Sequence, residues 1–355
     1  MGSGKNADSI IGCLLGTAVG DAIGLPCEGL SKRRQLRLYP HLNQHHFLFG
    51  RGMVSDDTEH TIMVAQALMA SKGDVYKFTQ DLAWRSRFWL LCLPAGIGQA
   101  TLQAILKLWL GFKPEHSGVF SAGNGPAMRS AILGVCYGND IQKLRQLVRA
   151  STRLTHTDPK AEFGALAVAI AAYLSSQPLN ITPYQYYHIL QYHLTAKAIE
   201  FLQLIEQACN SVEAGQTTEL FATQLGLERG VSGYIYHTVL VVIHAWLRYP
   251  QDYEEAILEV IRCGGDTDTT AAILGGIIGA SVGKNGIPNA WLNGLWEWPR
   301  TKEWMELLGQ RLADVTILEV KQQALSVPLY KILLRNLLFL LVVIFHGFRR
   351  LLPPY

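Results

Sequence analysis

The chain has 355 residues, of which 49% are hydrophobic and only 17% are charged, so it has ample apolar material for a large core. Its formal net charge of +3 is too small to indicate nucleic-acid binding, which usually needs a strongly basic surface. The six cysteines are scattered without a CxxC pair, and residues 1–10 are polar. These features predict a reduced, cytoplasmic setting and no secretory signal.

Most of the chain is expected to be helical, because long stretches are apolar on one side or throughout and few alternate as strands do. The expected helices lie near residues 9–23, 59–71, 77–91, 99–110, 126–137, 140–150, 160–176, 184–194, 196–213, 233–248, 252–262, 269–282, 301–312 and 331–348. Prolines fall between these runs, as expected where helices end. We therefore predict a single compact all-α domain of orthogonal helices over residues 1–315, followed by a helical tail over residues 316–355.

Two of the expected helices carry a small residue at every fourth position. The stripes are Gly12, Gly16, Gly20 and Gly24 in the first helix, and Ala271, Gly275, Gly279 and Gly283 in the second. Residues four apart share a helix face, and a helical glycine costs about 1 kcal/mol relative to alanine. Close backbone contact would offset this cost, so we expect the two helices to pack against each other or a common neighbour. That packing would bring Glu28 near the acidic residues that precede the second stripe.

Two short acidic clusters lie far apart in the chain. They are Ser55-Asp56-Asp57-Thr58 and Asp266-Thr267-Asp268-Thr269, and each opens an apolar, helix-like run. Helix capping explains one or two of these residues, because serine and aspartate cap well and acids suit a helix N-terminus. It does not explain neighbouring aspartates, whose repulsion a cation or solvent must relieve. Since Mg²⁺ prefers oxygen ligands, clusters that meet in the fold would form a two-metal centre.

Other polar groups have competing interpretations. Gly123-Asn124-Gly125 is either a phosphate-contacting loop or an ordinary turn before Pro126. His156 is either a ligand-binding residue or a hydrogen-bonded loop or core histidine. Two further segments, His41 to His46 and Lys32 to Arg37, are interpreted as solvated.

The C-terminal tail differs from the rest of the chain. Leu337 to Phe345 is an unbroken apolar run, with Arg335 before it and Arg349-Arg350 after it. A spanning helix needs about 20 apolar residues, so a shorter run is more often interfacial or buried. The basic flanks favour membrane-surface contact through residues 331–350, and burial against the body or a partner subunit is the alternative.

Taken together, the motifs resemble those of the ADP-ribosylglycohydrolases, which include the dinitrogenase reductase-activating glycohydrolases. The matching segments, in family order, are residues 11–24 with Glu28, 55–58, Gly123-Asn124-Gly125 with Ala127-Met128-Arg129, Thr155-His156, and 264–269. They span roughly residues 10–285, most of the chain, and are specific as a set.

The resemblance implies an all-α fold with a binuclear metal site that holds two Mg²⁺ or Mn²⁺ ions. It implies that the metal ligands are Ser55, Asp56, Asp57, Asp266, Asp268 and Thr269. It also implies that ADP-ribose is held by Ser121, Gly123, Asn124, Gly125 and His156. The family usually has threonine where Ser55 stands; serine keeps the hydroxyl but loses the methyl group.

The implied function is metal-dependent hydrolysis of the glycosidic bond between ADP-ribose and an acceptor, either a protein side chain such as arginine or serine or a small molecule. Its partner would then be an ADP-ribosylated protein or a small ADP-ribose conjugate. Glu28, Asp57 and Asp268 are the candidates for the catalytic acid or base, and the sequence does not rank them. The alternatives are a dinuclear-metal phosphohydrolase and a catalytically silent ADP-ribose-binding relative. The four intact aspartates argue against silence.

Overall fold

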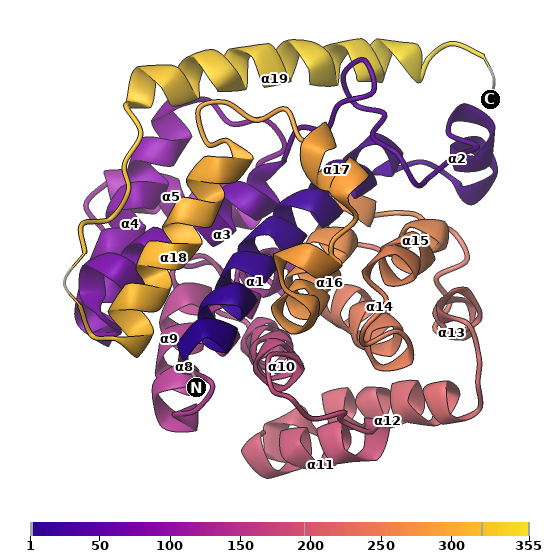
Figure 1. Cartoon of the computed structure of the whole chain (residues 1–355), viewed down its shortest axis with the longest axis horizontal. Helices are drawn as coiled ribbons and strands as arrows, with labels where there is room; N and C mark the ends of the chain where they lie inside the picture. Colours follow the sequence, from indigo (N-terminus) through magenta and orange to yellow (C-terminus); the bar gives the residue numbers. More distant parts are fainter. Residues whose placement is uncertain (1–2, 195, 321, 354–355) are drawn as a thin grey trace.

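The computed structural model describes residues 3–194, 196–320 and 322–353, and within these ranges the fold is all-α (Figure 1). Isolated β-bridges take the place of a sheet in the described part. The α-helices are α1 Ser3–Gly24, α2 Lys32–Leu38, α3 Asp56–Ser71, α4 Val75–Leu91, α5 Gln99–Trp109, α6 Pro114–Ser117, α7 Gly125–Met128, α8 Ala131–Tyr137, α9 Ile141–Arg153, α10 Pro159–Ser175, α11 Pro183–His193, α12 Ile199–Glu213, α13 Thr218–Gln224, α14 Ile235–Arg248, α15 Tyr253–Cys263, α16 Thr267–Val282, α17 Asn289–Gly294, α18 Lys302–Ile317 and α19 Leu329–Arg349. The predicted fold class is confirmed, and the boundary predicted at residue 315 stays a prediction.

The centre of the fold is an antiparallel pair formed by α1 and α16, as the two glycine stripes predicted (Figure 1). A Cβ atom added to Gly12 would lie 2.1 Å from the Gly279 carbonyl oxygen, and one added to Gly16 would lie 2.1 Å from that of Gly275. At the far end, the Thr267 hydroxyl donates to the Gly24 carbonyl over 2.9 Å. Only glycine allows this backbone-to-backbone contact, and the contact fixes the N-terminus of α16 beside the end of α1.

The remaining helices form a shell that buries this pair. α3, α8, α10, α14, α15 and α18 contact α1, α16 or both, and one large apolar cluster runs through all of them. Because α1 is buried over nearly all of residues 9–24, its apolar residues there are core residues: the window Ala7–Cys27 is long and apolar enough to cross a membrane, yet 94% of it is buried.

Two local predictions were wrong, and one short helix was not predicted. Residues 126–137 form two short helices, α7 and α8, instead of one. The basic segment that starts at Lys32 forms the unpredicted helix α2, on which Arg33 and Arg37 are exposed as expected. In the histidine-rich loop, His45 is only 5% exposed, and its Nε2 lies 2.8 Å from the Trp291 carbonyl oxygen. A buried backbone acceptor explains why this histidine is not solvated.

Helix α19 lies across one edge of the molecule, at the top of Figure 1. It is the second helix that is long and apolar enough to cross a membrane, but only 33% of its window is buried. Its inner face packs on residues that precede the first acidic cluster, in a separate apolar cluster that includes Leu25, Met53, Phe339 and Val342.

Candidate active site

One large cleft, with a volume of about 790 Å³, opens beside the N-termini of α3 and α16. Its lining includes nearly all of the predicted site residues, which come from five separate segments. They are Glu28, Ser55, Asp56, Ser121, Gly123, Asn124, Gly125, His156, Asp266, Asp268 and Thr269. Of the predicted residues, Asp57 lies outside this lining, with 1% of its surface exposed.

Asp21 on α1 holds the first acidic cluster in place. Its carboxylate accepts hydrogen bonds from the Ser55 backbone N–H at 3.0 Å and from the Thr58 hydroxyl at 2.6 Å. Ser55 is in turn the N-cap of α3, and its Oγ accepts a 3.2 Å hydrogen bond from the Asp57 backbone N–H. The start of α3 is therefore fixed to the central helix pair by a buried, fully used carboxylate.

Two consecutive glycines position the second acidic cluster. Gly264 and Gly265 have φ values of 72° and 81°, a region that side-chain-bearing residues rarely adopt. Gly265 passes so close to Val231 that an added Cβ would lie 2.0 Å from the Val231 carbonyl oxygen. This tight turn delivers Asp266 to the N-cap position of α16, where its side chain makes no cap hydrogen bond.

The two clusters meet directly. The Asp57 Oδ2 atom accepts a 3.0 Å hydrogen bond from the Ser55 hydroxyl and a 3.2 Å hydrogen bond from the Thr269 hydroxyl. Residues from α3 and α16, far apart in sequence, thus share one carboxylate. We refer to Asp56, Asp57, Asp266 and Asp268 together as the acidic centre.

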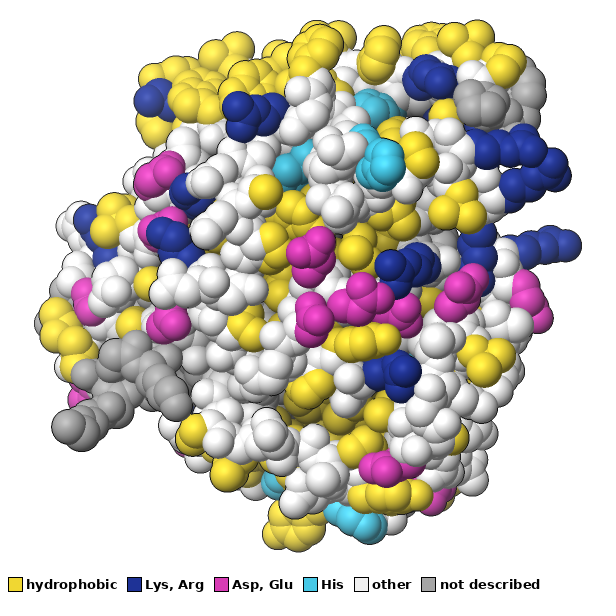
Figure 2. Space-filling view, turned by 45° about the vertical axis from the view of Figure 1, so that its right-hand side comes forward, with side chains coloured by type: hydrophobic (Ala, Val, Ile, Leu, Met, Phe, Trp, Pro, Cys, Tyr) yellow, Lys and Arg dark blue, Asp and Glu magenta, His cyan; other side chains and the backbone are white. Residues whose placement is uncertain are grey.

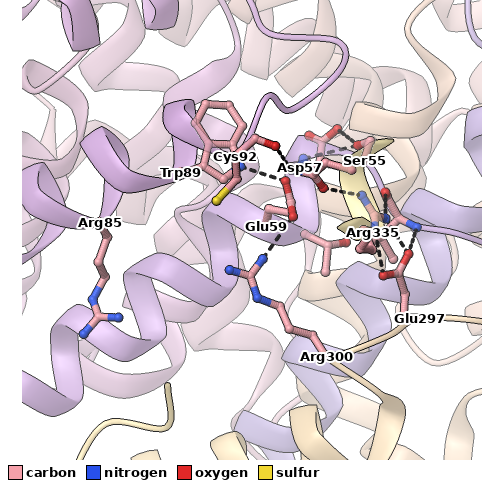
Figure 3. A network of polar contacts seen from close by, with 12 residues as sticks. Ser55, Asp57, Glu59, Arg85, Trp89, Cys92, Glu297, Arg300 and Arg335 are labelled. Carbon is pink, nitrogen blue, oxygen red and sulfur yellow. Dashed lines mark hydrogen bonds and ion pairs between the residues drawn. The ribbon is translucent and has the colours of Figure 1, made fainter. Parts of the chain in front are cut away.

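Carboxylates of the acidic centre have no cationic partner within the described residues, because none of the ion pairs found there includes them. Directly behind them the pattern is the opposite (Figure 3). Arg300 pairs with Glu59 at 3.0 Å, and Arg335 pairs with Glu297. Arginine therefore neutralises Glu59 and Glu297, whereas no ion pair within the described ranges neutralises the acidic centre.

That lack of compensation changes the ionisation of the acidic centre. Burial, reinforced by the negative charge of Asp56, raises the pKa of Asp57 well above its usual value. Burial likewise raises the pKa of Asp268, with further contributions from Glu28 and Asp266. A bound cation would reverse this effect, because it stabilises the ionised form.

Two observations test whether these residues fit divalent cations. The Asp57 Oδ1 and Asp268 Oδ1 atoms are buried and have no hydrogen-bond partner. Unpartnered buried oxygens are costly, so a ligand for them is expected. In the described ranges, however, no three acidic, histidine or cysteine side chains converge into a ready-made metal cage. The donor set fits Mg²⁺ in kind, as oxygen atoms of two carboxylate pairs and two hydroxyl groups.

Asn124 connects the glycine-flanked loop to the acidic centre. Its Nδ2 atom donates to Asp266 Oδ2 over 2.7 Å and to the Thr238 hydroxyl over 3.0 Å. The neighbouring Asn124 backbone N–H donates to the Gly233 carbonyl over 2.9 Å. This loop is therefore not an ordinary exposed turn, because its central side chain orients a carboxylate in the cleft.

His156 faces the same loop, and its hydrogen bonds define its tautomer. The buried Arg129 donates to the Thr155 hydroxyl over 2.6 Å, so the single proton of that hydroxyl is free to be donated to His156 Nδ1, 2.8 Å away. The His156 Nε2 atom then carries the ring proton and points toward Gly123, where an added Cβ would lie only 3.0 Å from it. Burial, with the nearby charge of Arg129, lowers the pKa of His156 to about 3, so the ring is a neutral donor.

Glu28 lies at the edge of the cleft, on the turn that follows α1. The side chain is exposed to the cleft, yet the surrounding walls exclude much of the water from its carboxylate. This desolvation, together with the charge of Asp266, raises the pKa of Glu28, while Arg350 opposes the rise. Of the three candidate catalytic residues, Glu28 is the most accessible and Asp57 the least.

Sequence reasoning missed two sets of residues. Asp21 lies in the matching segment 11–24, but its support of the first acidic cluster was not predicted. Phe339 and Val343 of α19 also line the cleft, and no motif marks them. An apolar run in the tail carries no signal for which of its faces will meet the body.

The fold and cleft define an all-α protein with an acidic centre at two helix N-termini, opposite a glycine-flanked polar loop. The chain belongs to the ADP-ribosylglycohydrolase family, whose model matches residues 3–322. The predicted family and the prediction of a hydrolase are thereby confirmed.

Known relatives agree with this placement. The chain is similar to an uncharacterized protein of Archaeoglobus fulgidus, at 31% identity over 87% of this chain and 97% of that protein. It is similar to the ADP-ribosyl-[dinitrogen reductase] glycohydrolase of Rhodospirillum rubrum, at 25% identity over 81% of this chain and 90% of the other. A solved structure, an ADP-ribosylglycohydrolase-related protein complex, matches with a TM-score of 0.61 and 26% identity, covering 88% of this chain and 99% of the other.

Proposed function

We propose that this protein hydrolyses the glycosidic bond between ADP-ribose and an acceptor, and that two divalent cations, Mg²⁺ or Mn²⁺, are required. Family membership and the names of relatives such as the ADP-ribosylhydrolase ARH3 of Gallus gallus support ADP-ribosyl hydrolysis. The single observation that supports the metals is the pair of buried, unpartnered oxygens of Asp57 and Asp268 in an acidic centre without a cation.

In this proposal the metal ligands are the hydroxyl groups of Ser55 and Thr269 together with the acidic centre, Asp56, Asp57, Asp266 and Asp268. When bound there, the ions supply positive charge that orients ribose hydroxyls and acidifies a water molecule. Asn124 fixes Asp266 in the required orientation through their 2.7 Å hydrogen bond.

The loop and His156 hold the rest of the nucleotide. Gly123 and Gly125 leave room beside the imidazole, because a Cβ at either position would lie within 3.2 Å of the ring. The His156 Nε2–H can donate to an oxygen of the diphosphate or of its ribose without adding charge, since the ring is neutral. Glycine at both positions also lets backbone N–H groups approach an anion.

Glu28 is the proposed general acid or base. Cleavage builds oxocarbenium character on the ribose, and proton transfer assists departure of the acceptor or attack by water. Glu28 reaches the cleft and its raised pKa brings it closer to neutrality, where a carboxyl group can hold or release a proton. Asp57, by contrast, is enclosed between α3 and α16, which favours a purely ligating role.

The test is release of ADP-ribose from ADP-ribosyl-arginine and ADP-ribosyl-serine peptides, with Mg²⁺ and with EDTA. We expect free ADP-ribose from at least one peptide, only with the metal. Release of AMP instead would identify the phosphohydrolase alternative, because the diphosphate and not the glycosidic bond would then be cut. Binding of ADP-ribose without any turnover would identify a silent relative.

We also propose that the outward face of α19 rests on an anionic membrane surface. Its exposed stripe consists of Leu334, Leu338, Leu341, Phe345 and Phe348, with exposures of 39% to 66%. Figure 2 shows this apolar band along the top of the molecule, with basic side chains at its right-hand end. The helix carries no acid, and its basic residues include Lys331 near its start and Arg349 at its end. Two more basic residues, Arg33 and Arg37, lie on α2, whose C-cap Tyr39 contacts His346 of α19. Such a combination fits an interfacial helix on acidic lipids.

A lying orientation, not a spanning one, follows from the opposite face, where Arg335, Asn336 and His346 are buried against the body. Co-sedimentation with vesicles containing phosphatidylserine tests the contact. Phe345→Ser with Phe348→Ser should abolish it, and Leu110→Ser, at a 78% exposed site on the end of α5, serves as the matched control. Loss of dimers instead of loss of vesicle binding would show that a second copy covers the stripe.

A further inference from the structure

We infer that α19 forms part of the active site: Phe339 and Val343 contact the acceptor portion of the substrate at the acidic end of the cleft. Both side chains line the cleft, and they come from a helix that lies beyond residues 3–322, the part matched by the family model. The inference rests on the proposed function, because it assigns the acceptor to the cleft wall that Phe339 and Val343 form, referred to below as the wall.

Buried polar contacts attach the inner face of α19 to the body of the protein. Arg335 donates to the Val54 carbonyl over 2.6 Å, and Glu297, its ion-pair partner, accepts from the Val54 backbone N–H over 2.7 Å. Val54 immediately precedes Ser55, so both backbone groups beside the first acidic cluster are fixed by this pair (Figure 3). The next residue, Asn336, donates to the Cys92 carbonyl over 2.9 Å.

The apolar contacts of α19 go to the same segments. Phe339 clusters with Leu25, three residues before Glu28, and with Met53, two residues before Ser55. Ala95 packs against this cluster, and its neighbour Gly96 faces Asp56, with an added Cβ 3.8 Å from the Asp56 Oδ1 atom. These three of the segments that α19 touches therefore lie next to Glu28 or Asp56 of the cleft.

These contacts place the wall at one end of the cleft. None of the contacts that tie α19 to the described body involves the Gly123–Gly125 loop or His156, which form the proposed nucleotide-binding end. The ribose and the group attached to it would occupy the acidic end, so Leu25, Ala95, Phe339 and Val343 offer that group an apolar surface. The substrate class that fits is a conjugate whose acceptor has an apolar stem within reach of this surface. An arginine acceptor has three methylene groups beyond the guanidinium that carries the ribose, whereas a serine acceptor has only one methylene group.

The experiment compares Val343→Ala and Phe339→Ala with Leu337→Ala, a change on the same helix at a 41% exposed site outside the cleft lining. Val343 is half-buried and lines the cleft, so its truncation should fold normally; thermal unfolding checks every variant. We expect KM for an ADP-ribosyl-arginine peptide to rise about threefold for Val343→Ala and about tenfold for Phe339→Ala, with kcat changed less. The affinity for free ADP-ribose, which lacks an acceptor, should change less than twofold, and Leu337→Ala should match the wild type.

Two results would overturn the inference. One is wild-type KM in both cleft variants; the other is an equal loss of affinity for free ADP-ribose and for the peptide, which would show a general effect on the cleft. If the wild type turns over no peptide, the proposed function fails, and binding of the intact peptide by calorimetry takes the place of KM. Weaker peptide binding in the two cleft variants alone would then still support the wall.

Discussion

Replacing Gly16 by alanine is the sharpest test of how the α1–α16 contact supports the site. The new Cβ would lie 2.1 Å from the Gly275 carbonyl oxygen, where an ordinary carbon–oxygen contact is about 3.3 Å, so the helices must separate by about 1 Å. Overpacking of this kind costs about 1–3 kcal/mol. Separation would also weaken the 2.6 Å hydrogen bond that the Tyr253 hydroxyl donates to the Gly16 carbonyl, which lowers the free energy of unfolding by about 1 kcal/mol more.

Alanine also favours the helix by about 1 kcal/mol, so the net destabilisation should be about 2 kcal/mol. The unfolding entropy is about 2.1 cal/mol/K per residue, so in a chain of 355 residues this loss corresponds to a fall in Tm of about 3 °C. Because α16 carries Asp266 and Asp268 at its N-terminus, the shift should also weaken Mg²⁺ binding, measured as a smaller Mg²⁺-induced rise in Tm.

A matched glycine provides the control. Gly347 lies in α19 with no atom within 4 Å of an added Cβ, so Gly347→Ala should leave Tm unchanged or raise it slightly. The reasoning would be refuted if Gly16→Ala unfolded at the wild-type temperature, or if both variants were destabilised equally.

The remaining predictions concern charges around the cleft. Asn124→Ala should lower metal affinity or activity about 10- to 100-fold, because the carboxylate it orients loses its donor; an unchanged Mg²⁺ titration would contradict this. Because burial raises the pKa of Asp57 and Asp268, the metal-free fold binds protons that the unfolded chain releases, so its Tm should fall as pH rises from about 4 toward neutrality. Added Mg²⁺ should raise Tm at pH 7 and change it little at pH 4.5, as measured by calorimetry. An equal rise in Tm at both pH values would show that the carboxylates are not the ligands. Arg335→Met should destabilise the protein by about 3–5 kcal/mol by leaving Glu297 buried without a partner, and adding Glu297→Gln should restore part of the loss in urea unfolding.

The sequence predicted the fold well where one physical requirement dominated a stretch of residues. The glycine stripes had a single economical explanation, contact between two helices, and Gly12 and Gly279 meet as expected. Long apolar helices were predicted with small errors in their ends. Short helices such as α2 and α13 were missed, because a single turn or two carries too little periodicity to stand out from a loop.

The site was predictable only in part, for a similar reason. Asp57 and Asp268 were conspicuous because each has a second aspartate within two residues at the start of an expected helix. The roles of Asp21, which holds the first acidic cluster, and of Arg129, which donates to Thr155, were not predictable, because both act through contacts made at long range. The wall formed by α19 depends on which face of an amphipathic helix meets the body, and local sequence does not determine that choice.

The α1–α16 contact also has a consequence for how the protein is made. Gly12 and Gly279 touch in the folded state, yet at about 5–20 residues per second the ribosome needs roughly 15–50 s to add the residues between them. Throughout that interval α1 lacks the surface it is shaped to fit, while its apolar sequence has the length and composition of a membrane span. The order of the helices therefore leaves this apolar segment without its main partner until the last quarter of the chain emerges.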